Sequence, residues 1–125
     1  MALQFNPVER TNPITKVKKW YAAPRQTGRR DLKSMSRDLA DTSSLSAGDV
    51  QNVIANLIDQ MPKWLMEGIS VRLDGFGSFR LSFSSDGVAT KDAVTANQIK
   101  DIRLIFEADN KIKTRIQDTK VNPAI

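Results

Sequence analysis

The chain has 125 residues, 40% hydrophobic and 26% charged, a composition typical of one compact globular domain. It contains no cysteine and no histidine, which excludes disulfides, thiolate nucleophiles, Ser-His and Cys-His catalysis and the usual zinc sites. No apolar run approaches the ~18 to 20 residues that span a bilayer, which excludes a membrane protein. The acidic residues form no recognisable pair or cluster, so we expect no catalytic residue, no metal and no cofactor.

The net charge of +5 is unevenly distributed along the chain. Residues 1–37 contain nine Lys or Arg and two acidic residues, a net charge of +7, so the remaining 88 residues sum to −2. Attraction to an anionic partner such as nucleic acid is therefore expected mainly in the first third of the chain. The alternative interpretation of this cluster is a solvated face that only keeps the protein soluble.

The first 28 residues favour extended structure. Two short apolar-polar stretches, Leu3–Arg10 and Val17–Ala23, are separated by Thr11-Asn12-Pro13, which predicts two strands or extended segments. In the second stretch Lys18 and Lys19 stand directly before Trp20 and Tyr21, a composition that suits phosphate contact beside stacking, although such aromatics are more often core residues. The N-terminus shows no basic start followed by an apolar core, so we expect no secretory signal and a cytoplasmic location.

Two helices are predicted next. The first begins between Thr27 and Asp31 and has a thin apolar face. The second has Ser46 as its N-cap and is the strongest helix of the chain; Pro62 lies inside it, where it is expected to cause a kink, and Gly68 stops it. Its apolar stripe consists of Val50, Val53, Ile54, Leu57, Ile58, Met61, Trp64 and Leu65. The pair of helices could be a helix-turn-helix motif, but the first turns of the second helix lack Lys and Arg, so the stripe is better explained as core or dimer contact.

The segment from Gly68 to Phe83 is the most informative part of the chain. Apolar and polar residues alternate on both sides of a glycine corner, which predicts two strands joined by a tight turn at Asp74-Gly75. A dinucleotide-binding fingerprint is the alternative for this corner, but a strand follows it and the third glycine is missing. Further along, the alternation of residues 102–106 predicts another strand, and residues 111–119 a short helix.

The order of these parts resembles the HU and integration host factor family of bacterial histone-like DNA-binding proteins. The specific part of the resemblance is Val71–Phe79, which contains Gly75-Phe76-Gly77-Ser78-Phe79, and it extends from about Asp31 to Lys120. The basic two-strand extension before it looks like the longer HU-related proteins of Bacteroides-type bacteria. The resemblance implies an α+β, HU/IHF-like fold, with two N-terminal helices packed on an antiparallel sheet, a β-arm, a short C-terminal helix and an intertwined homodimer.

From this resemblance we expect three regions: a basic N-terminal extension at 1–28, an HU-like DNA-binding domain at 29–121 and an irregular tail at 122–125. In the family, a pair of β-arms reaches around DNA in the minor groove, and an Arg-Asn-Pro tip wedges between base steps. Here Ser82, Ser84 and Gly87 stand where the family has cations, and no proline occurs between Pro62 and Pro123. The phosphate contacts are therefore expected to have moved partly to the N-terminal extension.

The implied function is non-sequence-specific binding of double-stranded DNA by a nucleoid-associated architectural protein, through contacts to the phosphate backbone. No small-molecule substrate is expected. The rival hypothesis is a structural or interaction module that keeps the fold and has lost DNA as its ligand. The candidate DNA-binding residues are Lys16, Lys18, Lys19, Arg25, Arg29, Arg30, Arg80, Lys91, Lys100, Arg103, Lys111, Lys113 and Arg115.

Overall fold

The computed structural model describes residues 2–124, which form an α+β fold with two three-stranded sheets. Three α-helices and two short 3-10 helices accompany the sheets. In chain order the elements are β1 (Leu3–Thr11), β2 (Lys18–Arg25), α1 (Leu32–Asp41), α2 (Ala47–Met66), β3 (Val71–Leu73), β4 (Gly77–Ser85), η1 (Lys91–Ala93), η2 (Ala96–Gln98), β5 (Ile99–Ala108), α3 (Asn110–Ile116) and β6 (Val121–Pro123).

Helix α1 begins with a reciprocal cap. The Asp31 carboxylate accepts a hydrogen bond from the Ser34 N–H at 2.8 Å, and the Asp31 N–H donates to the Ser34 hydroxyl at 3.0 Å. These bonds satisfy donors that the first turn leaves without partners. Hydrogen bonds from the backbone and side chain of Ser34 also lower the pKa of Asp31 below its ordinary value. The predicted helix start is thus confirmed at the end of its range.

Helix α2 matches the sequence prediction at both ends. The Ser46 hydroxyl accepts from the Asp49 N–H at 3.1 Å at the start, and the helix continues through Pro62 to Met66. Gly68 follows with φ of 84°, a left-handed conformation that glycine adopts without steric cost. Its N–H donates to the Leu65 carbonyl, which ends the helix and directs the chain into β3.

The second sheet has the order β3-β4-β5, and all its strands are antiparallel. Gly75 has φ of 81° in the predicted turn between β3 and β4. At Gly77 an added Cβ would lie 2.5 Å from both the Glu107 carbonyl oxygen and the Phe106 ring, so only glycine fits at this end of the β4–β5 pairing. The Phe76, Phe79 and Phe106 rings cluster beside it, with centroids 4.8–6.5 Å apart.

The first sheet has the order β2-β1-β6 and joins the two ends of the described chain. Both predicted strands form: β1 and β2 pair with each other as an antiparallel hairpin, while β6 pairs in parallel with β1. The expectation of an irregular tail from Asn122 was wrong for residues 122 and 123, since Asn122 pairs with Gln4 and Pro123 with Phe5. Proline is tolerated there because β6 is an edge strand. Ile125, also part of the expected tail, lies outside the described residues.

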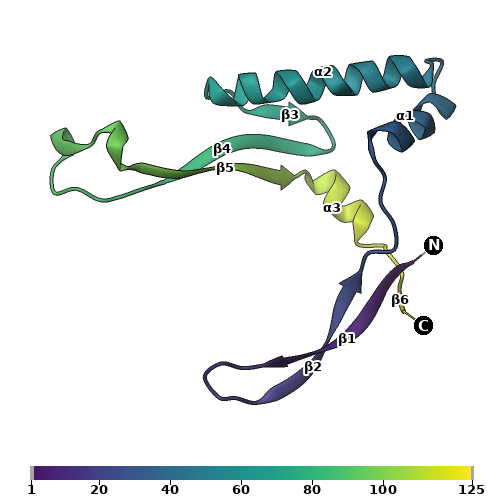
Figure 1. The fold of residues 1–125 in the computed structure, drawn as a ribbon, viewed down its shortest axis with the longest axis horizontal. Helices are drawn as coiled ribbons and strands as arrows, with labels where there is room; N and C mark the ends of the chain where they lie inside the picture. Colours follow the sequence, from purple (N-terminus) through teal and green to yellow (C-terminus); the bar gives the residue numbers. More distant parts are fainter. Residues whose placement is uncertain (1, 125) are drawn as a thin grey trace.

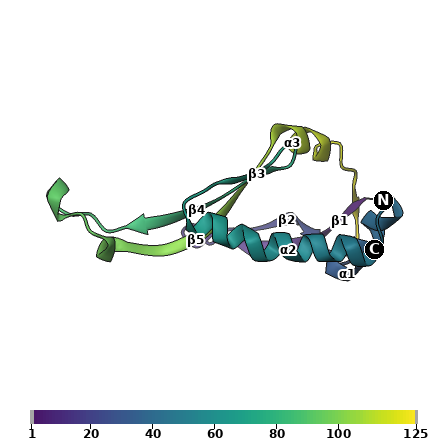
Figure 2. The same ribbon diagram turned by 90° about the horizontal axis from the view of Figure 1, so that it is seen from above.

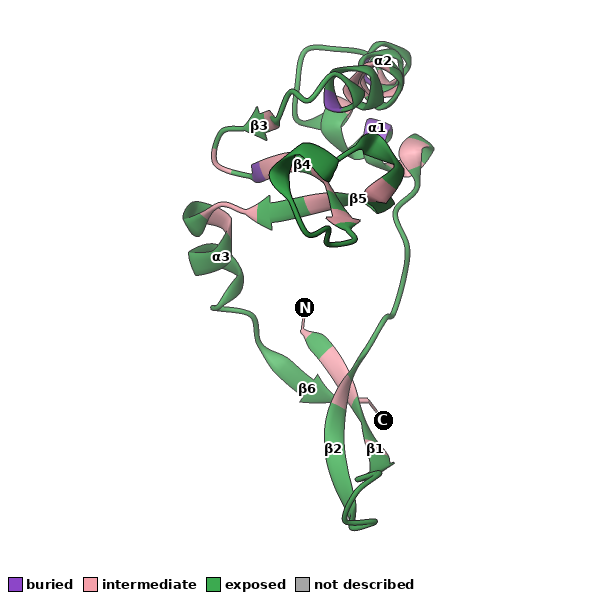
Figure 3. Cartoon of the chain, turned by 90° about the vertical axis from the view of Figure 1, so that its left-hand side faces the viewer, coloured by how far each residue is buried: buried purple, intermediate pink, exposed green. Residues whose placement is uncertain are grey.

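The elements surround no large core of their own. Helices α1 and α2 pack together, and α2 lies over β3 and β4 (Figure 1). Seen from above, the β4–β5 arm extends well past the end of α2 (Figure 2). Among the described residues only Ser36, Val50, Leu65 and Gly77 are buried (Figure 3). None of the helices in residues 2–124 is long and apolar enough to cross a membrane.

Candidate nucleic-acid interface

The chain presents two β-hairpins that could contact an extended polyanion. We call β1, β2 and their loop, residues 3–25, the N-terminal hairpin, and β4, β5 and their connection, residues 77–108, the β4–β5 arm. In Figure 1 the β4–β5 arm extends to the left beneath α2, and the N-terminal hairpin extends obliquely to the lower left. Figure 2 shows the arm reaching furthest from the helices. Figure 3 shows the N-terminal hairpin set apart from the helices, joined to them by the segments before α1 and after α3.

One face of the N-terminal hairpin gathers cations without an acidic residue. Arg10 lies opposite Lys19, and Val8 lies opposite Tyr21. Since alternate residues of a strand share a face, Arg25 lies on that face too. The Arg10 guanidinium carbon is 5.8 Å from the centroid of the Tyr21 ring, close enough for a cation–π contact. This basic face combines phosphate-binding groups with an aromatic surface on which a base or sugar could pack.

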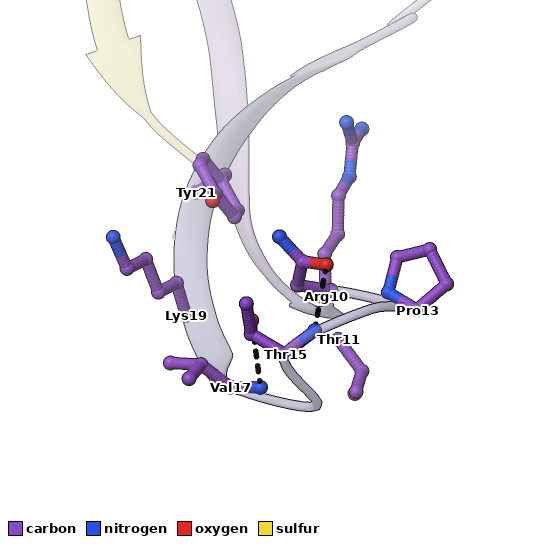
Figure 4. Close-up of a pocket in the computed structure, with 8 residues that line it drawn as sticks. Arg10, Thr11, Pro13, Thr15, Val17, Lys19 and Tyr21 are labelled. Carbon is purple, nitrogen blue, oxygen red and sulfur yellow. Dashed lines mark hydrogen bonds between the residues drawn. The ribbon is translucent and has the colours of Figure 1, made fainter.

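The same face is hollowed toward the hairpin tip. Arg10, Lys19 and Tyr21 line a concavity of ≈ 610 Å³ together with Pro13, Val17 and other loop residues (Figure 4). In Figure 4 the Arg10 and Lys19 side chains extend from different strands on either side of the loop. The hollow is open to solvent and carries two cations, which suits a strand of nucleic acid better than a small uncharged ligand.

The opposite face of the N-terminal hairpin is less basic. Lys18 Nζ lies 3.9 Å from Glu9 Oε1, a long and exposed ion pair. Trp20 lies opposite Glu9 and is exposed, so the alternative of a core residue does not hold within the single chain. Tyr21 is exposed as well. Of the predicted contacts, Lys19 and Arg25 therefore share the basic face, whereas Lys18 lies across the sheet from them.

The β4–β5 arm has a different electrostatic character, because two of its four predicted cations are held in ion pairs. Arg80 Nη2 lies 3.0 Å from Glu107 Oε1, and Lys100 Nζ lies 2.7 Å from Asp86 Oδ1. Arg103 donates to the Ser84 hydroxyl at 3.1 Å. The fourth predicted cation, Lys91, is exposed in η1. The arm contains as many acidic residues as cations, so its net charge is zero.

The remaining predicted contacts lie in the linker and in α3. Arg29 and Arg30 are in the segment before α1, where Arg30 Nε lies 3.6 Å from Asp38 Oδ2 across an exposed gap. Lys113 and Arg115 are exposed on α3, and the Lys111 side chain lies over the Gly75 turn. The structure thus distributes the thirteen predicted cations over four separate regions.

Sequence reasoning left Arg10 out of the candidate contacts. The signal was available: if Asn12 to Val17 is the hairpin loop, residue 10 must lie opposite residue 19. Arg72, another cation absent from the candidates, has a structural role. It bridges Asp74 and Asp109, and its Nη2 lies 2.8 Å from Asp109 Oδ2. No group of three or more acidic side chains that could hold a metal occurs within residues 2–124.

Two solved structures share this fold. The fold resembles HU from Anabaena in a cocrystal with DNA, with a TM-score of 0.56 and 15% identity over 71% of this chain and 99% of that one. It also resembles a crystal structure described as a bacterial DNA binding protein from Bacteroides vulgatus, with a TM-score of 0.65 and 20% identity. That match covers 97% of this chain but 47% of the Bacteroides chain, so the present chain spans about half of its length.

The sequence itself defines the family. A family model described as an HU domain fused to wHTH, Ig, or Glycine-rich motif, named HU-HIG, matches residues 1–123. Integration host factor subunit alpha from Haemophilus influenzae is 30% identical over 86 residues, which are 66% of this chain and 88% of that protein. The chain belongs to the HU-HIG family, and the resemblance to the HU and integration host factor proteins is confirmed.

Proposed function

We propose that this chain is an architectural protein that binds double-stranded DNA without sequence specificity, as a nucleoid-associated protein of the cytoplasm. The observation that carries the proposal is the basic face of the N-terminal hairpin, which presents Arg10, Lys19 and Arg25 beside Tyr21 with no acidic residue among them. Cations arranged in this way bind phosphates and release their counterions, an interaction that does not depend on base sequence.

Names of related proteins point to the same ligand. The Anabaena relative was crystallised with DNA, and the Bacteroides relative is described as DNA binding. The β4–β5 arm of the present chain has zero net charge, so we assign it a secondary role in binding. The linker cations Arg29 and Arg30 and the α3 cations Lys111, Lys113 and Arg115 would add weaker phosphate contacts, as would Lys16, Lys18, Lys91 and Arg103.

We also propose that the DNA-binding form is a homodimer, with 1–28 as a basic extension and 29–121 as the HU-like domain. The single chain leaves its apolar surface uncovered: Val53 on α2 is 62% exposed, and Leu104 and Phe106 on β5 are exposed too. An apolar stripe of this length is normally buried against another element. A second copy covering α2 and the sheet would supply that burial, and analytical ultracentrifugation should give twice the chain mass.

The test of DNA binding uses fluorescence anisotropy with a random-sequence duplex over a series of salt concentrations. If about six phosphates are neutralised, log K falls with log salt at a slope near −5. The double variant Arg10→Gln/Lys19→Gln should make that slope shallower by about 1.8 for each hairpin of the dimer that contacts the duplex. The matched double variant Arg80→Gln/Lys100→Gln removes the same charge from the arm and should change the slope by less than half as much, since both cations already have acidic partners.

The rival function, an HU-fold interaction module that no longer binds DNA, is favoured by the neutral β4–β5 arm. It predicts no anisotropy change for the wild-type chain even at low salt. If the two double variants instead change the salt slope equally, the chain binds DNA, but the placement of the contacts on the N-terminal hairpin is contradicted.

A further inference from the structure

The tip of the N-terminal hairpin has a feature that phosphate binding does not explain. Ile14 is 89% exposed, more than any other large hydrophobic side chain in the described chain, and it follows Pro13 at the turn between β1 and β2. A single exposed isoleucine is not informative in itself. Its position is informative, because the tip is the part of a projecting hairpin that can enter a groove.

The tip is held in one conformation by its own hydrogen bonds. The Asn12 side-chain oxygen accepts from the Ile14 N–H at 2.8 Å and from the Thr15 N–H at 3.2 Å. The Lys16 N–H donates to the Asn12 carbonyl at 2.7 Å, and Lys16 has φ of 58°, which turns the chain into β2. A loop that is already ordered presents Ile14 at little further cost in conformational entropy.

The surroundings of Ile14 select an anionic partner. Arg10, Lys16, Lys18 and Lys19 flank it, and no acidic residue occurs between Arg10 and Arg25. An apolar residue at the centre of a cationic tip is the arrangement by which minor-groove proteins insert a wedge between base steps while the cations hold the neighbouring phosphates. The tip of the β4–β5 arm also exposes valines, including Val94 at 61%, but its connection carries Asp86 and Asp92 against Lys91.

We propose that Ile14, supported by Pro13, inserts between adjacent base pairs of duplex DNA and unstacks them. This inference rests on the proposed function and deepens it: the N-terminal hairpin would deform the duplex as well as hold its backbone. Unstacking a step costs a few kcal/mol, so insertion should favour sites where stacking is already weak.

The experiment uses the full chain and two duplexes of the same length, one fully paired and one with a central mismatch, each with 2-aminopurine beside the central pair. The wild-type chain should bind the mismatched duplex about tenfold more tightly and raise its 2-aminopurine fluorescence, which reports unstacking. Ile14→Ala should bring the preference close to unity and abolish the fluorescence rise, with the salt slope unchanged since no cation is lost. Ile14→Leu should restore both.

Val94→Ala is the matched control, because it truncates an exposed valine at the other tip. It should leave the preference and the fluorescence rise as in the wild type. The inference is overturned if the wild type binds DNA without unstacking it, or if Ile14→Ala still unstacks it. Failure of the wild type to bind either duplex would overturn the proposed function itself, and with it the inference.

Discussion

The N-terminal hairpin and the β4–β5 arm are both two-stranded projections, but they differ in what holds them in place. The arm is anchored by the Phe76, Phe79 and Phe106 cluster and by the close packing of Gly77 against β5. The hairpin is held at its base by β6, three residues long, and by two connecting segments. The arm resembles part of a domain core, whereas the hairpin resembles an appended module.

The two projections also differ in charge, and the less firmly anchored one is the more basic. The anchored arm has zero net charge and two short ion pairs, while the loosely attached hairpin has five cations and one acidic residue. The recognisable part of an HU-like fold and its cationic surface can therefore lie on different elements. Packing limits which residues the arm can contain, whereas the faces of the hairpin can carry charged side chains.

The largest expected effect tests the anchoring of the arm. Gly77→Ala places a Cβ 2.5 Å from the Glu107 carbonyl and the Phe106 ring and should lower the free energy of unfolding by about 3 kcal/mol through overpacking. Gly87→Ala, where nothing lies within 4 Å, is the control and should stay within about 0.5 kcal/mol of the wild type. Urea denaturation measures both. Equal urea midpoints for the two variants would mean that the close packing at Gly77 does not anchor the arm.

A smaller effect is expected where the β3–β4 turn attaches to α3. The Asp109 carboxylate accepts from Arg72 at 2.8 Å, from the Gly75 N–H at 3.1 Å and from the Asn110 N–H at 2.8 Å. Asp109→Ala should therefore cost about 2 kcal/mol of stability, because charged hydrogen bonds at a half-buried site are lost. Asp74→Ala removes the other partner of Arg72 but should cost less than about 0.5 kcal/mol, since Asp74 is 95% exposed. Thermal unfolding should separate them, and similar losses would contradict the assigned role of Asp109.

The charge contrast can be reversed in part. Asp86→Asn releases Lys100, which is paired at 2.7 Å, and should strengthen DNA binding about threefold and steepen the salt slope by about 0.9. Asp92→Asn removes the same charge from the same loop, but Asp92 has no ion-pair partner within residues 2–124, so its slope should stay near that of the wild type. Anisotropy titrations of both variants decide this. If the salt slopes of the two variants change equally, ion pairing does not keep the arm cations from contacting DNA.

The smallest effect concerns the junction between the hairpin linker and α1. The folded state lowers the pKa of Asp31, so its capping contribution is present above the ordinary pKa of 3.8 and is lost as the pH falls through the lower pKa of the folded state. Asp31→Asn keeps a capping side chain but removes this titration. Below pH 3.8 its melting temperature should therefore fall less steeply with decreasing pH than that of the wild type. Parallel curves for the two proteins would show that the cap does not titrate.

The local elements of this protein follow from its amino-acid sequence. The Asp31 and Ser46 caps, the positive-φ glycines at 68 and 75 and the alternation along β1, β2, β4 and β5 depend on neighbours within a few residues, and all were predictable. The concentration of cations before residue 38 is also evident from the sequence, and it predicts that an anionic partner binds the N-terminal region.

Which cations lie together depends on the three-dimensional fold. The pairing of β6 with β1 joins residues more than a hundred positions apart, and no local pattern announces it. The ion-pair partners of Arg80 and Lys100 depend on the register of β4 against β5. The residues beside Arg10 depend on the register of β1 against β2. A charge counts toward binding through its neighbours in space, which a single sequence does not specify.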